Sequence, residues 1–326
     1  MRIFVAVLIF SGAVIIGCML FLKPANPCQP QKLELIATIS PLADWLREVG
    51  GTDVEVHCLV SGAANPHHFE PSMKDVMCIS QARAVFIIGL GLDAWAEKLA
   101  RNSGRGEKLA FFSTGAWIAP RRIGEATIEV RSSAPVQAVG KNDHEDHIED
   151  DDEHRQGDFD PHYWLDPVRA AIVVTRMGEE LGKLDPEHRD AYKLRAVKYG
   201  AELKALSDEL AKHAHTVPTG TKLVTFHDAY GYLFERLGIK VAAVVQVSPG
   251  VEPSPRDFTE ALRIMRELGQ RTVFTEPMDS AGAARIAAHE LGGEVQPLDP
   301  MDGEGPAGKT YIDRLHEDVN VIMNSL

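Results

Sequence analysis

Three histidines in this chain occupy positions where a metal could be bound. His67 follows the strand predicted at 54–60, and His227 directly follows the strand predicted at 222–226. His162 ends a long loop and precedes a predicted helix. Neutral imidazole is the commonest metal ligand in proteins, and three converging imidazoles favour zinc. We therefore predict a metal site built from residues that are far apart in the sequence.

Two carboxylates also lie at the ends of predicted strands, as two of the histidines do. Glu276 ends the strand predicted at 272–275, and Asp299 ends the strand predicted at 294–298. Open α/β sheets present ligand sites at the carboxyl ends of their strands, so two facing lobes would form a cleft lined by such residues. A single histidine is more often solvated or hydrogen-bonded than a ligand, but four candidates at strand ends across two lobes favour a metal site. Asp299, Glu276 and water all compete for the fourth position.

The elements that position these residues follow an alternating β/α pattern. Between two blocks of this pattern lie two long helices, predicted at 166–184 and 186–214. Strands that alternate with helices predict parallel sheets. We therefore expect an α/β fold of two lobes, each with a parallel-type sheet flanked by helices. The predicted strands are 33–39, 54–60, 84–89, 108–112, 222–226, 240–247, 272–276 and 294–300.

The N-terminus carries an export or anchor signal at 1–23. Arg2 precedes an uncharged apolar run of about 20 residues, and the segment IIGC, which ends at Cys18, resembles a bacterial lipobox. That resemblance implies cleavage before Cys18 and lipidation of this residue. An uncleaved membrane helix is the alternative, because the apolar run continues to Leu22. Either anchor, followed by a Pro-rich tether at 24–32, places the rest of the chain outside the cytoplasm.

The remaining residues form a first lobe at 33–165, a connecting helix at 166–186 and a second lobe at 187–326. The first lobe includes an acidic histidine-rich loop at 141–158. A loop of this length in a compact domain is usually functional or disordered. The net charge of −13 argues against nucleic acid as a partner, which would require a basic surface.

Cys58 and Cys78 leave two alternatives open. In an exported chain these thiols could form a disulfide. Cysteine also packs as a small hydrophobic residue, so two buried thiols are equally expected. No CxxC spacing occurs, and we assign neither residue to a metal.

Several stretches together resemble one family, the metal-binding extracytoplasmic solute-binding proteins of zinc and manganese ABC importers (ZnuA/TroA-like). The resemblance runs from about residue 33 to the C-terminus. It implies two lobes bridged by one long rigid helix, with the metal cleft between the lobes and a small closing motion, and helix 166–184 fits that role. The matching stretches are NPHHFEPSMKDV (65–76), GLGLDAWAEKL (89–99), DPHYWLDP (160–167), FHDAYGYL (226–233), TEP (275–277) and LDP (298–300).

The resemblance also implies a set of ligands. It places one ligand at His67 and leaves His68 at a variable position, and His162 and His227 carry over directly. Asp299 matches a carboxylate ligand of some members. Glu276 corresponds to a residue that orients a ligand histidine. Weak accessory sites are expected at His144, His147 and His154, because zinc-specific members carry a similar loop.

The function implied is high-affinity capture of zinc and its delivery to the membrane permease of an ABC importer. Three imidazoles with at most one carboxylate suit Zn²⁺, whereas Mn²⁺, the alternative, prefers more oxygen ligands. We expect a monomer without enzymatic activity. A zinc hydrolase is a further alternative, although no HExxH motif is present. An adhesin is another, and no residue of the sequence is specific to it.

Overall fold

The computed structural model describes residues 32–61, 64–123, 159–245, 253–276 and 282–326. The predicted anchor at 1–23 and the histidines of the acidic loop, His144, His147 and His154, lie outside these residues. Within the described part of the chain, no helix is both long and apolar enough to cross a membrane.

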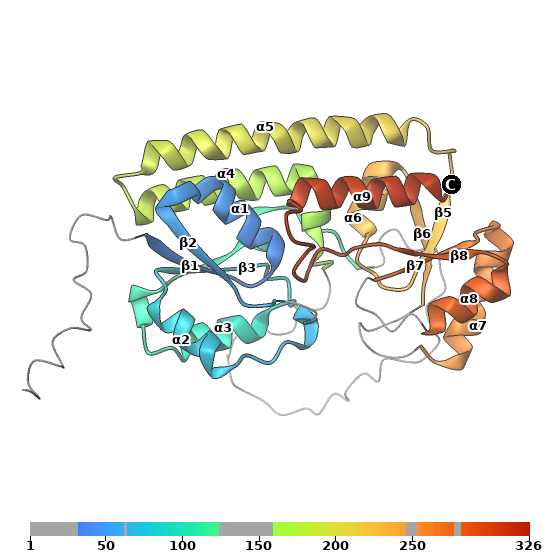
Figure 1. The fold of residues 1–326 in the computed structure, drawn as a ribbon, viewed down its shortest axis with the longest axis horizontal. Coiled ribbons are helices and arrows are strands. Elements are labelled where there is room, and N and C mark those ends of the chain that lie inside the picture. The colour runs from blue at the N-terminus through green and yellow to red at the C-terminus, as the bar shows by residue number, and fades with distance from the viewer. Residues whose placement is uncertain (1–31, 62–63, 124–158, 246–252, 277–281) are drawn as a thin grey trace, which may run out of the picture. The chain divides into compact units, whose positions relative to one another are not determined.

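The first lobe is built on a parallel sheet of four strands in the order β2-β1-β3-β4. Alternate residues of β1 face opposite sides, since Leu35 and Ala37 pack in the core that includes α1, whereas Ile36 packs with residues of α2 and α3. Figure 1 shows α1 on one side of this sheet and α2 and α3 on the other. The elements are β1 (Leu33–Ala37), α1 (Ser40–Gly50), β2 (Val54–Cys58), α2 (Met73–Gln81), β3 (Ala84–Ile87), α3 (Ala94–Arg101) and β4 (Ala110–Ser113).

The second lobe contains two parallel strand pairs, β5 with β6 and β7 with β8. The side chain of Gln270 joins the pairs, because its amide accepts a hydrogen bond from Val224 N (2.7 Å) and donates to Val224 O (3.0 Å). The elements are β5 (Lys222–Thr225), α6 (Gly231–Leu237), β6 (Lys240–Val244), α7 (Pro255–Leu268), β7 (Thr272–Thr275), α8 (Gly282–Leu291), β8 (Glu294–Pro297) and α9 (Tyr311–Asn324).

Two antiparallel helices, α4 (Pro167–Leu184) and α5 (Arg189–Ala214), come between these blocks in the sequence and lie side by side in the structure (Figure 1). α4 ends just before Asp185, which precedes Pro186 and so disfavours further helix. α5 contacts α1 of the first lobe and both α6 and α9 of the second. α4, the helix expected to connect the lobes, also contacts α1 and is bound to α6 through Asp166 and Arg236, so α4 and α5 share the bridging role.

A single apolar core continues from the first lobe into the second. It includes side chains of α1, α4, α5, α6 and α9, and the rings of Trp45 on α1 and Tyr311 on α9 meet edge to face with centroids 5.3 Å apart. Tyr311 also donates a hydrogen bond to Trp164 O at 2.5 Å. A wide hinge motion would expose this core to water, so the packing favours small relative movements of the lobes.

The start of α4 is fixed by a buried carboxylate from the DPHYWLDP stretch. Asp166 accepts a hydrogen bond from Val168 N and caps the helix. Arg169 and Arg236, the latter on α6, both bind the same carboxylate. This fully buried charge is therefore paired, and it ties α4 to the second lobe directly after the segment that carries His162.

Candidate metal centre

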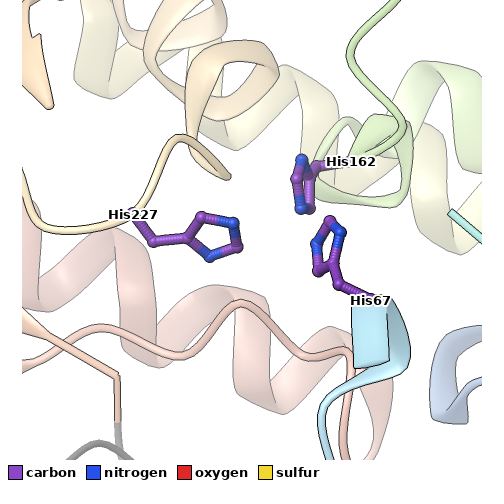
Figure 2. Close-up of side chains that lie close together, drawn as sticks. All are labelled: His67, His162 and His227. Atoms are coloured by element: carbon purple, nitrogen blue, oxygen red, sulfur yellow. The ribbon is translucent and has the colours of Figure 1, made fainter. Parts of the chain in front are cut away.

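His67, His162 and His227 lie together, although they come from three separate segments (Figure 2). One ring nitrogen from each lies within 4.8 Å of those of the other two, and among the described residues this is the group of histidines, cysteines and carboxylates that could hold a metal ion. Their ring centroids are 5.0–5.5 Å apart. The predicted convergence of the three histidines is therefore present in the structure.

His67 lies in a short 3₁₀ turn, Pro66–His68, which follows β2. The Asn65 side chain accepts a hydrogen bond from His67 N at 2.8 Å, and Pro66 sets the backbone at the start of the turn. The indole of Trp95 on α3 donates to Pro66 O at 3.1 Å. The turn is thus fastened to the first lobe, and His67 is held at a defined place.

His162 is held by the residue two positions before it. Its Nδ1 lies 2.9 Å from Asp160 Oδ1, which also accepts a hydrogen bond from His162 N at 3.0 Å. In the neutral ring, an Nδ1–H that donates to a carboxylate leaves the lone pair on Nε2, the nitrogen that then binds metal. Trp164 packs beside the ring with centroids 5.1 Å apart.

His227 has an equivalent partner in Glu276, just beyond the end of β7, whose Oε1 is hydrogen-bonded to His227 Nδ1. Both side chains are nearly buried. Glu276 is therefore placed to orient the imidazole, the role that the resemblance implied. Asp160 was not named from the sequence as a partner of a ligand, although it stands in the same DPHYWLDP stretch as His162.

The nitrogens that face the cluster are costly to leave without a partner. Within the described residues, Nε2 of His67 and Nε2 of His162 are buried and accept or donate no hydrogen bond. A buried polar atom without a partner costs about 1–3 kcal/mol. A cation at the centre would bind these lone pairs, and the three imidazoles therefore fit a metal ion.

Burial also keeps two of the rings neutral. It lowers the pKa of His67 to about 2, with the nearby histidines adding to the effect, and it lowers the pKa of His162 well below its usual value. Burial acts in the same direction on His227, but the hydrogen bond and charge of Glu276 outweigh it and raise the pKa. Neutral imidazole is the form that binds metal, so two of the three rings need lose no proton.

Three buried or partly buried carboxyls interact electrostatically with His227, those of Asp160, Asp228 and Asp302. Burial raises the pKa of Asp160 to about 6, and burial followed by the charge of Glu276 raises that of Asp302 to about 7. Burial also raises the pKa of Asp228. Several acidic groups held close together out of water are stabilised by a positive ion among them. Asp302 was not predicted, and its distance of three residues from Asp299 in an LDP-x-D sequence is the signal that could have found it.

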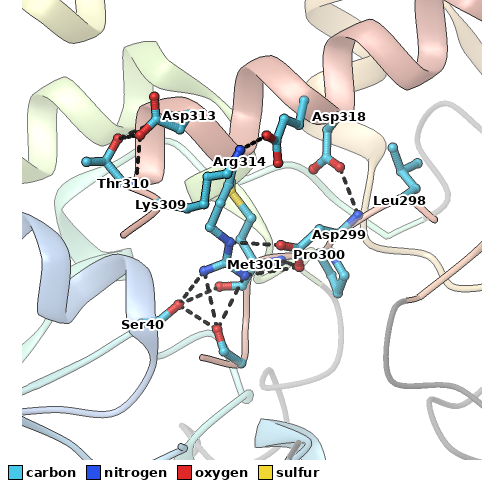
Figure 3. A network of polar contacts seen from close by, with 12 residues as sticks. Ser40, Leu298, Asp299, Pro300, Met301, Lys309, Thr310, Asp313, Arg314 and Asp318 are labelled. Atoms are coloured by element: carbon cyan, nitrogen blue, oxygen red, sulfur yellow. Dashed lines mark hydrogen bonds and ion pairs between the residues drawn. The ribbon is translucent and has the colours of Figure 1, made fainter. Parts of the chain in front are cut away.

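Asp299, the predicted carboxylate ligand, is engaged elsewhere (Figure 3). Its two oxygens accept hydrogen bonds from Arg314 Nε at 2.8 Å and Nη2 at 3.0 Å, and Oδ1 also accepts from Met301 N. Arg314 in turn donates to Ser40 Oγ on α1 at 2.9 Å. The structure does not bring Asp299 into the histidine cluster. It makes Asp299 part of a network that ties the loop after β8 to the first lobe.

The two cysteines of the first lobe, Cys58 and Cys78, are free thiols in the structure. Both line a cavity of about 490 Å³ that contains none of the three histidines. Burial raises the pKa of Cys58 to about 12, so this thiol stays protonated and unreactive. The sequence left open a disulfide or two thiols, and in the structure the two residues are thiols.

Comparison with known proteins places the chain among zinc-uptake components. The profile of the family described as "Zinc-uptake complex component A periplasmic" matches residues 35–325. The chain is 26% identical over 295 residues to the zinc-binding protein AdcA of Streptococcus pyogenes serotype M6, covering 89% of this chain and 55% of AdcA. It thus spans about half the length of that relative.

Two further likenesses cover at least nine-tenths of the other protein. The high-affinity zinc uptake system protein ZnuA of Bacillus subtilis is 24% identical, with 93% of this chain and 91% of that protein covered. The solved structure of the laminin-binding protein Lmb of Streptococcus agalactiae, described as bifunctional with adhesin and metal-transporting activity, matches with a TM-score of 0.74 and 27% identity. The match covers 90% of this chain and 99% of Lmb. The two-lobed α/β fold expected from the resemblance is confirmed.

Proposed function

Because the chain belongs to the family of periplasmic zinc-uptake components, we propose that it captures Zn²⁺ outside the cytoplasm and passes it to the permease of an ABC importer. The ligands are His67, His162 and His227. The observation that carries the proposal is the convergence of the three imidazoles, two of them with buried, unpartnered Nε2 atoms. The names of the relatives, AdcA and ZnuA, point to the same ion.

The donor set decides between zinc and manganese. Three nitrogens form a borderline-soft site that suits Zn²⁺, while Mn²⁺ prefers a majority of oxygens. Two nitrogens on one tetrahedral zinc ion are roughly 3.4 Å apart, given Zn–N bonds of about 2.0–2.1 Å. The separations in the cluster, all within 4.8 Å, need only a small contraction to reach that geometry. Loading is therefore accompanied by a small approach of the three segments.

A binding role accounts for the site better than hydrolysis does. A zinc hydrolase needs an open coordination position and a general base beside the bound water. Glu276, the carboxylate that could serve as that base, is occupied by Nδ1 of His227. This arrangement supports a role in which the protein releases the ion it binds and transforms no substrate. It acts as a monomer tethered at the outer face of the membrane through Cys18 or through an N-terminal helix.

Adjacent histidines provide a matched test. We expect isothermal titration calorimetry to give one tight Zn²⁺ site that His67→Ala abolishes and His68→Ala retains, because His68 is not a member of the cluster. Equal losses in the two variants, or a tight site that survives His67→Ala, would contradict the proposed ligands. An ester or peptide hydrolysis assay on the zinc-loaded protein should show no turnover, and turnover that a chelator abolishes would overturn the binding role.

A further inference from the structure

We propose that Arg121 is a positioning residue of the metal centre, which holds Asp160 against His162 and joins the His162 segment to the helix that follows His227. The inference rests on the metal site of the proposed function. Arg121 lies outside the three histidine motifs, in the segment that follows β4. It extends the site beyond the residues that contact the ligand rings.

The two oxygens of the Asp160 carboxylate have separate roles. Oδ1 accepts the hydrogen bonds from His162, while Oδ2 accepts one from Arg121 Nη1 at 3.1 Å. The Arg121 and Asp160 side chains are only 11% and 6% exposed, so water competes little for either. A carboxylate held on both oxygens cannot rotate without breaking one contact. Arg121 thereby fixes the acceptor on which the orientation of His162 depends.

A closed set of main-chain contacts supports the same arrangement. Arg121 N donates to the hydroxyl of Tyr232 at 2.8 Å, and that hydroxyl donates to Asp160 O at 2.9 Å. Asp160 N donates to Arg121 O at 2.9 Å. Tyr232 is buried on α6, so its hydroxyl attaches the backbones of both Arg121 and Asp160 to that helix.

Gly231 leaves the space in which the guanidinium lies. A Cβ built on Gly231 would be 1.7 Å from Arg121 Nη1 and 3.0 Å from Asp160 Oδ2. A separation of 1.7 Å is far below van der Waals contact, so any larger residue would displace the arginine. Gly231 is the first residue of α6 and follows His227 by four positions. The Arg121–Asp160 pair therefore sets the His162 segment against the segment that carries His227.

The shape of the arginine side chain suits this place. While Nη1 binds Asp160, Nε lies 3.3 Å from Glu235, also on α6, and the guanidinium carbon lies 5.2 Å from the centre of the Tyr232 ring. Lysine, with a single ammonium group, cannot make both ionic contacts at once. Glu235 is 59% exposed, so its ion pair contributes little and Asp160 is the partner that matters.

Arg121→Met tests the proposal against a matched control, Arg195→Met. Arg195 also binds a carboxylate, Asp53, and backbone oxygens, but at the end of α1 and away from the histidines. We expect Arg121→Met to weaken Zn²⁺ binding by about 10–100-fold, the effect typical of removing a group behind a metal ligand, and to alter the visible spectrum of the Co²⁺-loaded protein. Arg195→Met should leave both unchanged, and Arg121→Lys should restore only part of the affinity.

The tautomer of His162 gives a readout that a general loss of stability would not change. In ¹⁵N NMR of the metal-free protein, wild type should carry the proton on Nδ1, and Arg121→Met should shift the population toward Nε2–H. Gly231→Ala, which keeps the arginine but fills its space, should reproduce the shift if Arg121→Met does not fold.

Wild-type affinity and tautomer in Arg121→Met, or equal losses of affinity in Arg121→Met and Arg195→Met, would overturn the proposal. A wild-type protein that binds no Zn²⁺ would instead contradict the proposed function. The metal-free tautomer measurement would then still decide the role of Arg121, since an unchanged tautomer would overturn it.

Discussion

Glu276 and His227 are hydrogen-bonded through Nδ1 of the imidazole, although they lie 49 residues apart and follow different strands. The pairing exists because β5 and β7 are neighbours, so their carboxyl ends meet at one edge. It leaves the other nitrogen of His227 for a metal ion. The carboxylate therefore acts on the ion through the ring it holds.

Replacing Glu276 should weaken zinc binding without removing a ligand. We expect Glu276→Ala to raise the zinc Kd by about 10–100-fold, because the imidazole of His227 loses both its orientation and the charge that increases its basicity. Glu276→Gln, which keeps a hydrogen-bond acceptor and loses the charge, should have the smaller effect. Competition titrations with a zinc chelator measure these constants. An unchanged Kd in Glu276→Ala would show that the hydrogen bond does not serve the site.

Of the three histidines, only His227 should release a proton when zinc binds near neutral pH. Burial lowers the pKa of His67 to about 2 and that of His162 well below its usual value, so both are already neutral. Glu276 outweighs burial at His227 and raises its pKa, so this ring carries a proton that the ion must displace.

The sign of the pH dependence follows from that proton. Protonated His227 competes with zinc, so below its raised pKa the affinity should fall by about tenfold per pH unit as the pH decreases. Above that pKa the affinity should level off. Calorimetry in buffers of different ionisation enthalpy counts the protons released. The count is made in the Asp302→Asn variant, because the carboxyl of Asp302, with its pKa of about 7, could add a proton of its own. Two or three protons per ion in that variant, or none, would contradict the assignment.

The alternation of strands and helices, and the three histidines at their ends, could be predicted because both depend on local sequence. Parallel strands such as AVFI at 84–87 are buried on both faces and appear as continuous apolar runs. The histidines follow from the rule that ligands gather at the carboxyl ends of such strands. What depends on tertiary packing was not predicted, including the bridging role of α5, which follows from its contacts with α1, α6 and α9.

The carboxylates of the site also depend on tertiary packing that the local sequence does not reveal. Asp299 stands where a ligand was expected, yet Arg314, fifteen residues later on α9, takes its carboxylate. No local pattern reveals that pairing, because it depends on where α9 packs. Arg121 was missed for the same reason, since its side chain binds residues from other segments.

Asp302, and not Asp299, should be the carboxylate that completes the coordination of the ion. The charges of Glu276 and His227 both act on the pKa of Asp302, which is within electrostatic range of the cluster, whereas both oxygens of Asp299 are bound by Arg314. We expect Asp302→Asn to weaken zinc binding by about tenfold or more.

Asp299→Asn is the matched control. It should leave the zinc affinity near that of wild type but lower the free energy of unfolding by about 1–3 kcal/mol, because Arg314, only 4% exposed, would lose its charged partner. Urea denaturation and zinc titration of both variants separate the two effects. The reverse result, with affinity lost in Asp299→Asn and kept in Asp302→Asn, would restore Asp299 as the ligand.

Deleting residues 143–154 should leave the tight site intact and reduce the number of weakly bound zinc ions. This stretch, which lies outside the described residues, carries His144, His147 and His154 among eight carboxylates. Imidazole and carboxylate both bind Zn²⁺, but without a fixed arrangement each site is weak. The three converging histidines are held by contacts outside this stretch, through Asn65, Asp160 and Glu276. Calorimetry of the deletion variant should therefore show the tight transition unchanged and the weak, multi-site phase diminished, and loss of the tight transition would show that the loop supplies a ligand.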